Sequence, residues 1–191
     1  MLISNDFEVA QPVSKVWEFF GDIPRVAACL PGAQLTDNLG DDKYGGSVAV
    51  RMGPVRLQFA GTAEITERDE SGKRIVVHAS GADERGRGQA SMVVTAALTP
   101  AGSGTKVAVT QDLQLAGAAA QYGRGMISDV TAVLMRDFSA NMASQIAAAE
   151  RGETVQAAAA PAGGLAIGLR AALMALRRVF RRFFVPYQAT S

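Results

Sequence analysis

Alternation of apolar and polar residues predicts that most of residues 43–115 form strands. In "VRLQFAGTAEITE", which begins at Val55, apolar or small residues alternate with polar ones at a period of two, as in a strand with one buried face. The segments "KYGGSVAVRM", "RIVVHAS", "QASMVVTAALTP" and "TKVAVTQDLQL" carry the same signal and are separated by turn residues. Consecutive short strands joined by tight turns predict an antiparallel meander with one dry face.

Helical patterns flank these strands. The chain opens with "LISNDFEVA", in which Ile3, Phe7 and Val9 predict a further strand, and short helices are predicted in "PVSKVWEFFGD" and "PRVAACL". A long helix is predicted from Ala118 to about Ala149, because apolar residues recur there at intervals of four and are predicted to share one helical face, from Tyr122 through Met126 to Phe138 and beyond. This order predicts an α+β fold in which a curved antiparallel sheet grips a C-terminal helix.

One polar residue interrupts an apolar strand face. In "KVAVTQDLQL", Gln111 shares a face with Val107, Val109, Leu113 and Leu115. A glutamine that faces an apolar interior needs a hydrogen-bond partner, which a ligand carbonyl could supply. The alternative is a strand twist or bulge that turns Gln111 toward water.

Charge divides the chain into an acidic and a basic part. Residues 1–150 hold 13 Lys and Arg against 17 Asp and Glu, a net charge of −4, whereas residues 151–191 hold 6 against 1, a net charge of +5. The acidic part has no basic stripe, so we do not expect it to bind nucleic acid. Asp6 and Glu8 lie where a signal peptide has its basic start and apolar run, so export by that route is not expected.

The basic part is predicted to be a membrane anchor. Residues 151–164 are rich in Ala, Gly and Pro and are predicted to link a body of residues 1–150 to a tail of residues 165–191. On a helical wheel the large apolar residues of the tail fall within one arc and its arginines lie opposite. This pattern is typical of a helix lying in a membrane interface, and docking onto a protein partner is the alternative. The predicted membrane-binding residues are Arg170, Arg177, Phe180, Arg181, Arg182, Phe183 and Phe184.

The residue chemistry argues against catalysis. His78 is the single histidine and Cys29 the single cysteine, so neither a His-based triad nor a Cys/His metal site is expected. The glycine-containing "GSGTK" lacks phosphate-loop spacing and lies between two strands. The pair Asp83-Glu84 is interpreted as solvated loop carboxylates. Because no nucleophile–base pair can be nominated, the chain is predicted to be neither an enzyme nor a metal-binding protein.

Four segments resemble the family of the G subunit of carbon monoxide dehydrogenase, within the START-like, helix-grip superfamily. They are "FEVAQPVSKVWEFFGD", "ACLPG", "GPVRLQFAG" and "QYGRGMISDVTAVLMRDFSANM". The resemblance covers residues 1–148 and is most specific at residues 28–32 and 52–61. It implies a membrane-associated accessory protein for a molybdenum CO dehydrogenase or a related hydroxylase, with no molybdenum, iron–sulfur cluster or flavin of its own. It carries over no catalytic residue, and Cys29 is interpreted as part of a packed turn at the rim of a cavity.

The resemblance also implies an apolar cavity between sheet and helix. Its predicted lining is Val55, Leu57, Phe59, Val107, Val109 and Gln111 from the strands and Tyr122, Met126, Val130, Leu134 and Phe138 from the long helix. The alternative is that these side chains meet and fill an ordinary core.

An anchor beside an apolar cavity suggests a cargo that resides in the membrane. The leading hypothesis is a peripheral protein on the cytoplasmic side of the cell membrane that binds a quinone, menaquinone or ubiquinone, and presents it to the dehydrogenase as electron acceptor. One alternative is a pure adaptor that recruits the dehydrogenase to the membrane without cargo. Another is a START-like enzyme acting on a hydrophobic small molecule.

Overall fold

The computed structural model describes residues 1–53 and 55–152. The predicted tail, residues 165–191, and nearly all of the predicted linker lie outside the described residues, and so do the seven predicted membrane-binding residues. No helix in the described part combines the length and apolar composition that crossing a membrane requires.

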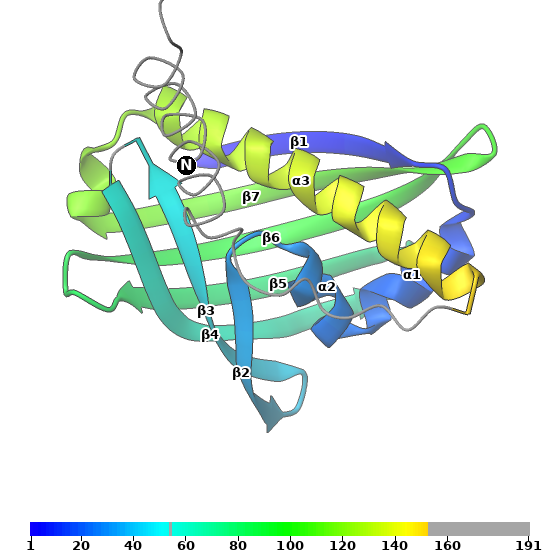
Figure 1. The fold of residues 1–191 in the computed structure, drawn as a ribbon, viewed down its shortest axis with the longest axis horizontal. Helices are drawn as coiled ribbons and strands as arrows, with labels where there is room; N and C mark the ends of the chain where they lie inside the picture. Colours follow the sequence, from blue (N-terminus) through cyan, green and yellow to red (C-terminus); the bar gives the residue numbers. More distant parts are fainter. Residues whose placement is uncertain (54, 153–191) are drawn as a thin grey trace, which may run out of the picture. The chain divides into compact units, whose positions relative to one another are not determined.

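The described chain forms one antiparallel sheet with three α-helices and a 3₁₀ helix (Figure 1). The strands pair in the order β1-β7-β6-β5-β4-β3-β2. The elements in chain order are β1 (Leu2–Val9), α1 (Val13–Gly21), α2 (Ile23–Cys29), β2 (Ala33–Gly40), β3 (Lys43–Met52), β4 (Val55–Asp69), β5 (Arg74–Asp83), β6 (Gly88–Ala101), β7 (Gly104–Gly117), the 3₁₀ helix η1 (Ala118–Gln121) and α3 (Arg124–Glu150).

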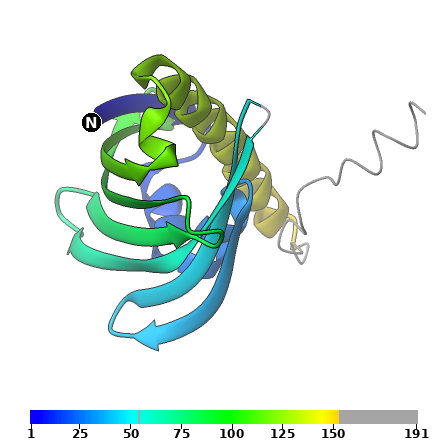
Figure 2. The same cartoon turned by 90° about the vertical axis from the view of Figure 1, so that its left-hand side faces the viewer.

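The sheet curls around α3, as Figure 2 shows. The helix contacts β1 at one edge of the sheet and also β3, which lies next to the opposite edge strand. Glycines lie opposite one another where the sheet bends, with Gly46 paired to Gly61 and Gly61 to Gly81. A Cβ at Gly61 would lie 1.9 Å from the Ser80 carbonyl oxygen, so a side chain there would prevent this close approach. The predicted α+β architecture, a curved antiparallel sheet gripping a long helix, is confirmed.

The edge strand β2 was not predicted. It contains two large apolar residues, Leu35 and Leu39, and both are exposed. Nearly the whole strand is exposed, so its sequence does not show the alternation of apolar and polar residues that a half-buried strand has. Pairing with β3 alone makes it a strand.

The phase of α3 differs from the prediction. The helix begins at Arg124, so Tyr122 precedes it, and the buried side chains include Ile127, Thr131 and Phe138. Met126 is 44% exposed and does not share the inner face with Phe138. The reason is geometric: a helix has 3.6 residues per turn, so a four-residue repeat drifts by about 40° per step, or about 120° from residue 126 to residue 138. The predicted single helix face from Tyr122 to Phe138 is therefore wrong.

Candidate functional site: a polar break in the apolar interior

Buried apolar side chains inside the sheet form two separate clusters. The first, here named the α1 cluster, packs around helix α1 and includes Phe19, Phe20, Val107, Val109, Phe138 and Met142. The second, the η1 cluster, lies at the other end of the strands and consists of Ile3, Met52, Leu57, Phe59, Ala119 and Ile127, with partly buried neighbours that include Leu113 and Leu115. Strands β1 and β7 each contribute residues to both clusters. The residues of these two strands that lie between the two clusters therefore mark a break in the apolar interior.

Two amide side chains lie at this break. On β7, Gln111 separates Val109 of the α1 cluster from Leu113, which packs on the η1 cluster. On β1, Asn5 takes the equivalent position. In the register of the two strands Ile3 lies opposite Gln111 and Asn5 opposite Val109, so the amides are diagonal neighbours on one face.

Both amides have a buried nitrogen without a hydrogen-bond partner. Among the described residues, Nδ2 of Asn5 and Nε2 of Gln111 are the buried side-chain nitrogens that make no hydrogen bond. Gln111 is only 8% exposed, and both nitrogens are closed off from bulk solvent. A buried polar group without a partner costs about 1–3 kcal/mol, and such groups in a folded protein call for an explanation. A ligand with acceptor oxygens placed between the clusters would satisfy both nitrogens.

The helix offers no third donor at this level. Thr131 lies on the buried face of α3 between Ile127 and Phe138. Its hydroxyl donates to the Ile127 carbonyl oxygen at 2.8 Å, which uses its one proton within the helix. Among the described residues, the buried side-chain donors left without a partner at the break are therefore the two strand amides.

The remaining predicted lining residues divide between the clusters. Val107, Val109 and Phe138 belong to the α1 cluster, whereas Leu57 and Phe59 belong to the η1 cluster, on which Val55 and Tyr122 pack. Val130 and Leu134 are half-buried, and Met126 points outward. Gln111 faces inward, as one of the two sequence interpretations required. Asn5 was not predicted as a site residue. The signal was present, because Ile3, Phe7 and Val9 alternate along one strand face and Asn5 takes the remaining position on that face.

Cys29 is a structural residue in this arrangement. It is fully buried, and its carbonyl oxygen accepts a hydrogen bond from Asn141 Nδ2 of α3 at 2.9 Å. Burial raises the pKa of the Cys29 thiol to about 11, although the positive charge of Arg25 partly opposes this shift. The thiol is therefore protonated and unreactive at neutral pH. Within the described residues no three His, Cys, Asp or Glu side chains gather as a metal site.

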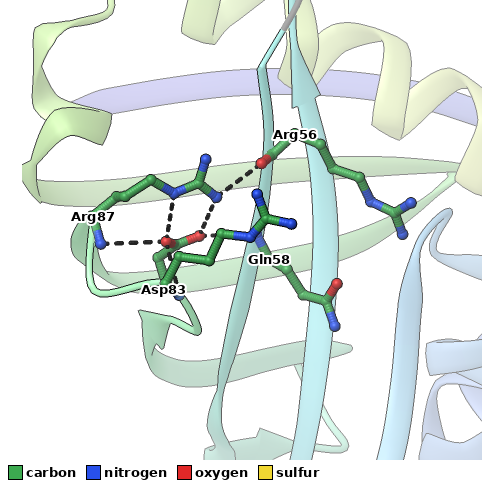
Figure 3. Close-up of polar contacts among 5 residues, drawn as sticks. Arg56, Gln58, Asp83 and Arg87 are labelled. Atoms are coloured by element: carbon green, nitrogen blue, oxygen red, sulfur yellow. Dashed lines mark hydrogen bonds and ion pairs between the residues drawn. The ribbon is translucent and has the colours of Figure 1, made fainter.

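A second polar cluster organises the connection between β5 and β6 (Figure 3). The Asp83 carboxylate accepts hydrogen bonds from the Arg87 guanidinium at 2.8 and 2.9 Å and from the backbone nitrogens of Gln58, Arg85 and Arg87. Arg87 Nη2 also donates to the Arg56 carbonyl oxygen at 2.9 Å, which ties the connection to β4. Asp83 is buried, so its interpretation as a solvated loop carboxylate is wrong. The hydrogen bonds from Arg87 hold the pKa of Asp83 well below its usual range.

This pKa shift predicts how Asp83 contributes to stability. Because the pKa is lowered on folding, the contribution is complete above the unfolded-state pKa of about 3.9 and is lost as the pH falls below it. The substitution Asp83→Asn should lower the melting temperature at pH 7 by several degrees. The difference from the parent protein should shrink from pH 5 to pH 3 and further at lower pH, because the carboxylate of the unfolded parent takes up a proton there while that of the folded parent stays ionised. A melting-temperature difference that stays constant over this pH range would contradict the assignment.

Comparisons with solved structures agree with this fold. A conserved protein from Geobacillus kaustophilus has a TM-score of 0.69 at 22% identity, over 77% of this chain and 95% of that one. The Zhui aromatase/cyclase from Streptomyces sp. R1128 has a TM-score of 0.57 at 14% identity, over 84% and 99%. A Thermus thermophilus protein has a TM-score of 0.56 at 12% identity, over 76% and 99%. At these identities the likeness shows the START-like, helix-grip fold and not an activity.

Two sequence comparisons bear on the family. No curated protein matches the chain significantly. The family model described as CoxG, the G subunit of carbon monoxide dehydrogenase, matches residues 6–147. The matched range spans α1, α2, the strands from β2 to β7, the second half of β1 and nearly all of α3. Since this match covers well over half of the chain, the protein belongs to the CoxG family of carbon monoxide dehydrogenase.

Proposed function

We propose that this protein is a membrane-tethered accessory protein of a molybdenum CO dehydrogenase, and that it presents a membrane quinone to that enzyme as electron acceptor. Family membership supports the accessory role. The observation that carries the quinone is the pair of buried, unpartnered amide nitrogens of Asn5 and Gln111 within an otherwise apolar interior. The basic, amphipathic sequence of residues 165–191 supports the tether.

A quinone matches the chemistry of the polar break. Its ring carbonyls are hydrogen-bond acceptors, which are what the two amide nitrogens lack. Its ring and isoprenoid chain are apolar and suit the side chains of the α1 and η1 clusters on either side. A fatty-acid chain alone would leave both nitrogens unsatisfied, so the amides favour a ligand that has carbonyl groups inside the apolar interior.

The chain's own residues bind and orient the cargo, and perform no bond-making step. The amides of Asn5 and Gln111 hold the polar head group, and the apolar clusters exclude water from it. Electrons reach the quinone from the dehydrogenase, where the redox chemistry takes place. An adaptor without cargo would recruit the enzyme equally well, but it gives no reason for two unpaired amides in the interior.

Reconstitution tests this proposal directly. Vesicles containing menaquinone are mixed with purified CO dehydrogenase, and CO-dependent quinone reduction is followed by its absorbance with and without the full-length protein. We expect the protein to accelerate reduction at least tenfold, because the quinone leaves the bilayer only in a protein-bound form. Equal rates with and without the protein, while the dehydrogenase reduces a soluble dye normally, would contradict the carrier role. Acceleration that survives Gln111→Leu unchanged would favour the adaptor.

A further inference from the structure

Four exposed arginines of the body have no acidic partner in the described part of the chain. Most other Lys and Arg side chains of the body form ion pairs there, for example Arg74 with Glu67 and Lys106 with Asp6. No ion pair within residues 1–53 and 55–152 involves the exposed residues Arg51, Arg56, Arg85 or Arg124. In a body whose net charge is −4, unpaired cations are unexpected.

These four arginines lie at one end of the fold, here named the arginine end. Arg51 and Arg56 flank the tip of the β3–β4 hairpin, Arg85 lies in the β5–β6 connection, and Arg124 begins α3. Direct contacts join these segments: the Arg87 guanidinium binds the Arg56 carbonyl oxygen, and the Ala118 nitrogen donates to the Arg87 carbonyl oxygen. The η1 cluster packs the hairpin against the first turn of α3. Figure 2 looks onto this end of the molecule.

The arginine end concentrates positive charge at short range. Arg51 and Arg56 are directly opposite each other in the register of β3 and β4, and like charges in this arrangement repel. A surface pocket of about 460 Å³ beside them is lined by Val55, Arg56, Gln58, Glu84, Arg85 and Arg87. Glu84 is the one carboxylate in this lining, and it accepts a hydrogen bond from Gln58 Nε2 at 3.0 Å. Asp83 neutralises Arg87, so the guanidinium groups of Arg56 and Arg85 are opposed only by the Glu84 carboxylate in this lining. The lining therefore has an excess of positive charge that could attract an external anion.

The arginine end also carries an exposed apolar side chain. Met126, in the first turn of α3 two residues after Arg124, is 44% exposed. A surface that combines cations with an exposed, flexible apolar residue is typical of one that meets lipid, where the charges contact head groups and the apolar group enters the acyl boundary. A nucleic acid or a highly acidic protein surface would use the arginines but would gain nothing from the methionine.

We propose that the arginine end of the body docks onto anionic phospholipid head groups, with Met126 directed into the bilayer surface. This inference rests on the proposed membrane association and adds to it: the body has a lipid-binding face of its own, separate from the tail. Docking would turn the η1 cluster and the η1–α3 junction toward the bilayer, so that a membrane ligand reaches the polar break without crossing water.

The first test removes the charges in the full-length protein. Two triple variants are compared: the arginine variant carries Arg51→Gln, Arg56→Gln and Arg85→Gln, and the control carries Lys43→Gln, Arg74→Gln and Lys106→Gln. The control lowers the net charge equally, but it alters half-exposed cations that form surface ion pairs elsewhere. Sedimentation with vesicles containing phosphatidylserine should show at least tenfold weaker binding for the first variant, and less than twofold for the second, because each cation near an anionic surface contributes about 1 kcal/mol. Equal effects of the two variants, or an effect of neither, would overturn the proposal.

The second test reports which end of the body touches the membrane. Cys29 is buried and unreactive, so a cysteine introduced by Met126→Cys or by Ser103→Cys, in the exposed β6–β7 turn at the opposite end, can be labelled with an environment-sensitive fluorophore. With phosphatidylserine vesicles we expect a blue shift of emission from position 126 and none from position 103. If the labelled protein sediments with the vesicles but the emission from position 126 does not shift, all membrane binding would be assigned to the tail and the proposal would be overturned.

These outcomes are distinct from failure of the proposed function. If the arginine end does not bind lipid, the proposed function still stands. The purified protein would still contain quinone, and its sedimentation with vesicles would still depend on the tail. If the arginine variant retains vesicle binding but loses affinity for the dehydrogenase, this end is a protein interface and the lipid assignment is wrong.

Discussion

Replacing Gln111 with leucine is expected to stabilise the empty protein and to weaken its quinone binding, two effects of opposite sign. Leucine has a similar volume and removes a buried amide whose nitrogen has no partner, which relieves a cost of about 1–3 kcal/mol. The melting temperature of ligand-free protein should therefore rise by several degrees. The same change removes a donor to the ligand carbonyl, so affinity for a short-chain ubiquinone analogue should fall about tenfold or more.

A matched control lies three residues farther along the same strand. Gln114 is exposed on the outer face of β7. Gln114→Leu should therefore leave the affinity for the analogue unchanged, and it should change the free energy of unfolding by less than about 0.5 kcal/mol. Scanning calorimetry on delipidated protein and isothermal titration with the analogue measure the two effects. A loss of stability in Gln111→Leu would mean that the amide is satisfied inside the protein, and the argument for a carbonyl-bearing ligand would fail.

Phe138→Ala should produce the largest loss of stability among single substitutions on α3. Phe138 is buried in the α1 cluster, where its ring meets the edge of Phe7 at a centroid distance of 6.1 Å and packs near Phe20 at 6.4 Å. Truncating a buried phenylalanine costs about 3–5 kcal/mol, which corresponds to a fall in melting temperature of roughly 10 °C for a body of this size.

Met126→Ala is the control for Phe138→Ala, because the prediction from sequence placed both residues on one face. The structure leaves Met126 largely exposed, so its truncation should cost less than about 1 kcal/mol in chemical denaturation. Comparable losses for the two variants would contradict the phase assigned to α3 and would restore the single face predicted from the four-residue repeat.

The elements that could be predicted from the sequence are those whose burial leaves a periodic pattern. In β4 and β7 inward apolar residues alternate with outward polar ones, so both strands and the inward position of Gln111 follow from period two. The exposed edge strand β2 has no such pattern, because its backbone pairing with β3 makes no demand on its side chains. The long helix was predicted, but its phase was not, since a repeat of four and a repeat of 3.6 diverge over a helix of 27 residues.

The candidate site required the register of strands that are distant in sequence. Gln111 could be singled out because it interrupts an apolar face. Asn5 lies more than 100 residues away, and only the pairing of β1 with β7 brings it diagonally beside Gln111. Likewise, the burial of Asp83 depends on the fold of the β5–β6 connection around Arg87, which a pair of loop carboxylates in the sequence does not reveal.

The central claim is that the interior between the two clusters holds a quinone. The most direct measurement is organic extraction and mass spectrometry of the full-length protein, purified in mild detergent from cells that make menaquinone or ubiquinone, with Gln111→Leu and Gln114→Leu prepared in parallel. We predict close to one quinone per protein chain in the parent and in Gln114→Leu, and a severalfold lower content in Gln111→Leu. Quinone at background level in all three preparations, together with no binding of the short-chain analogue to the folded parent, would contradict the account.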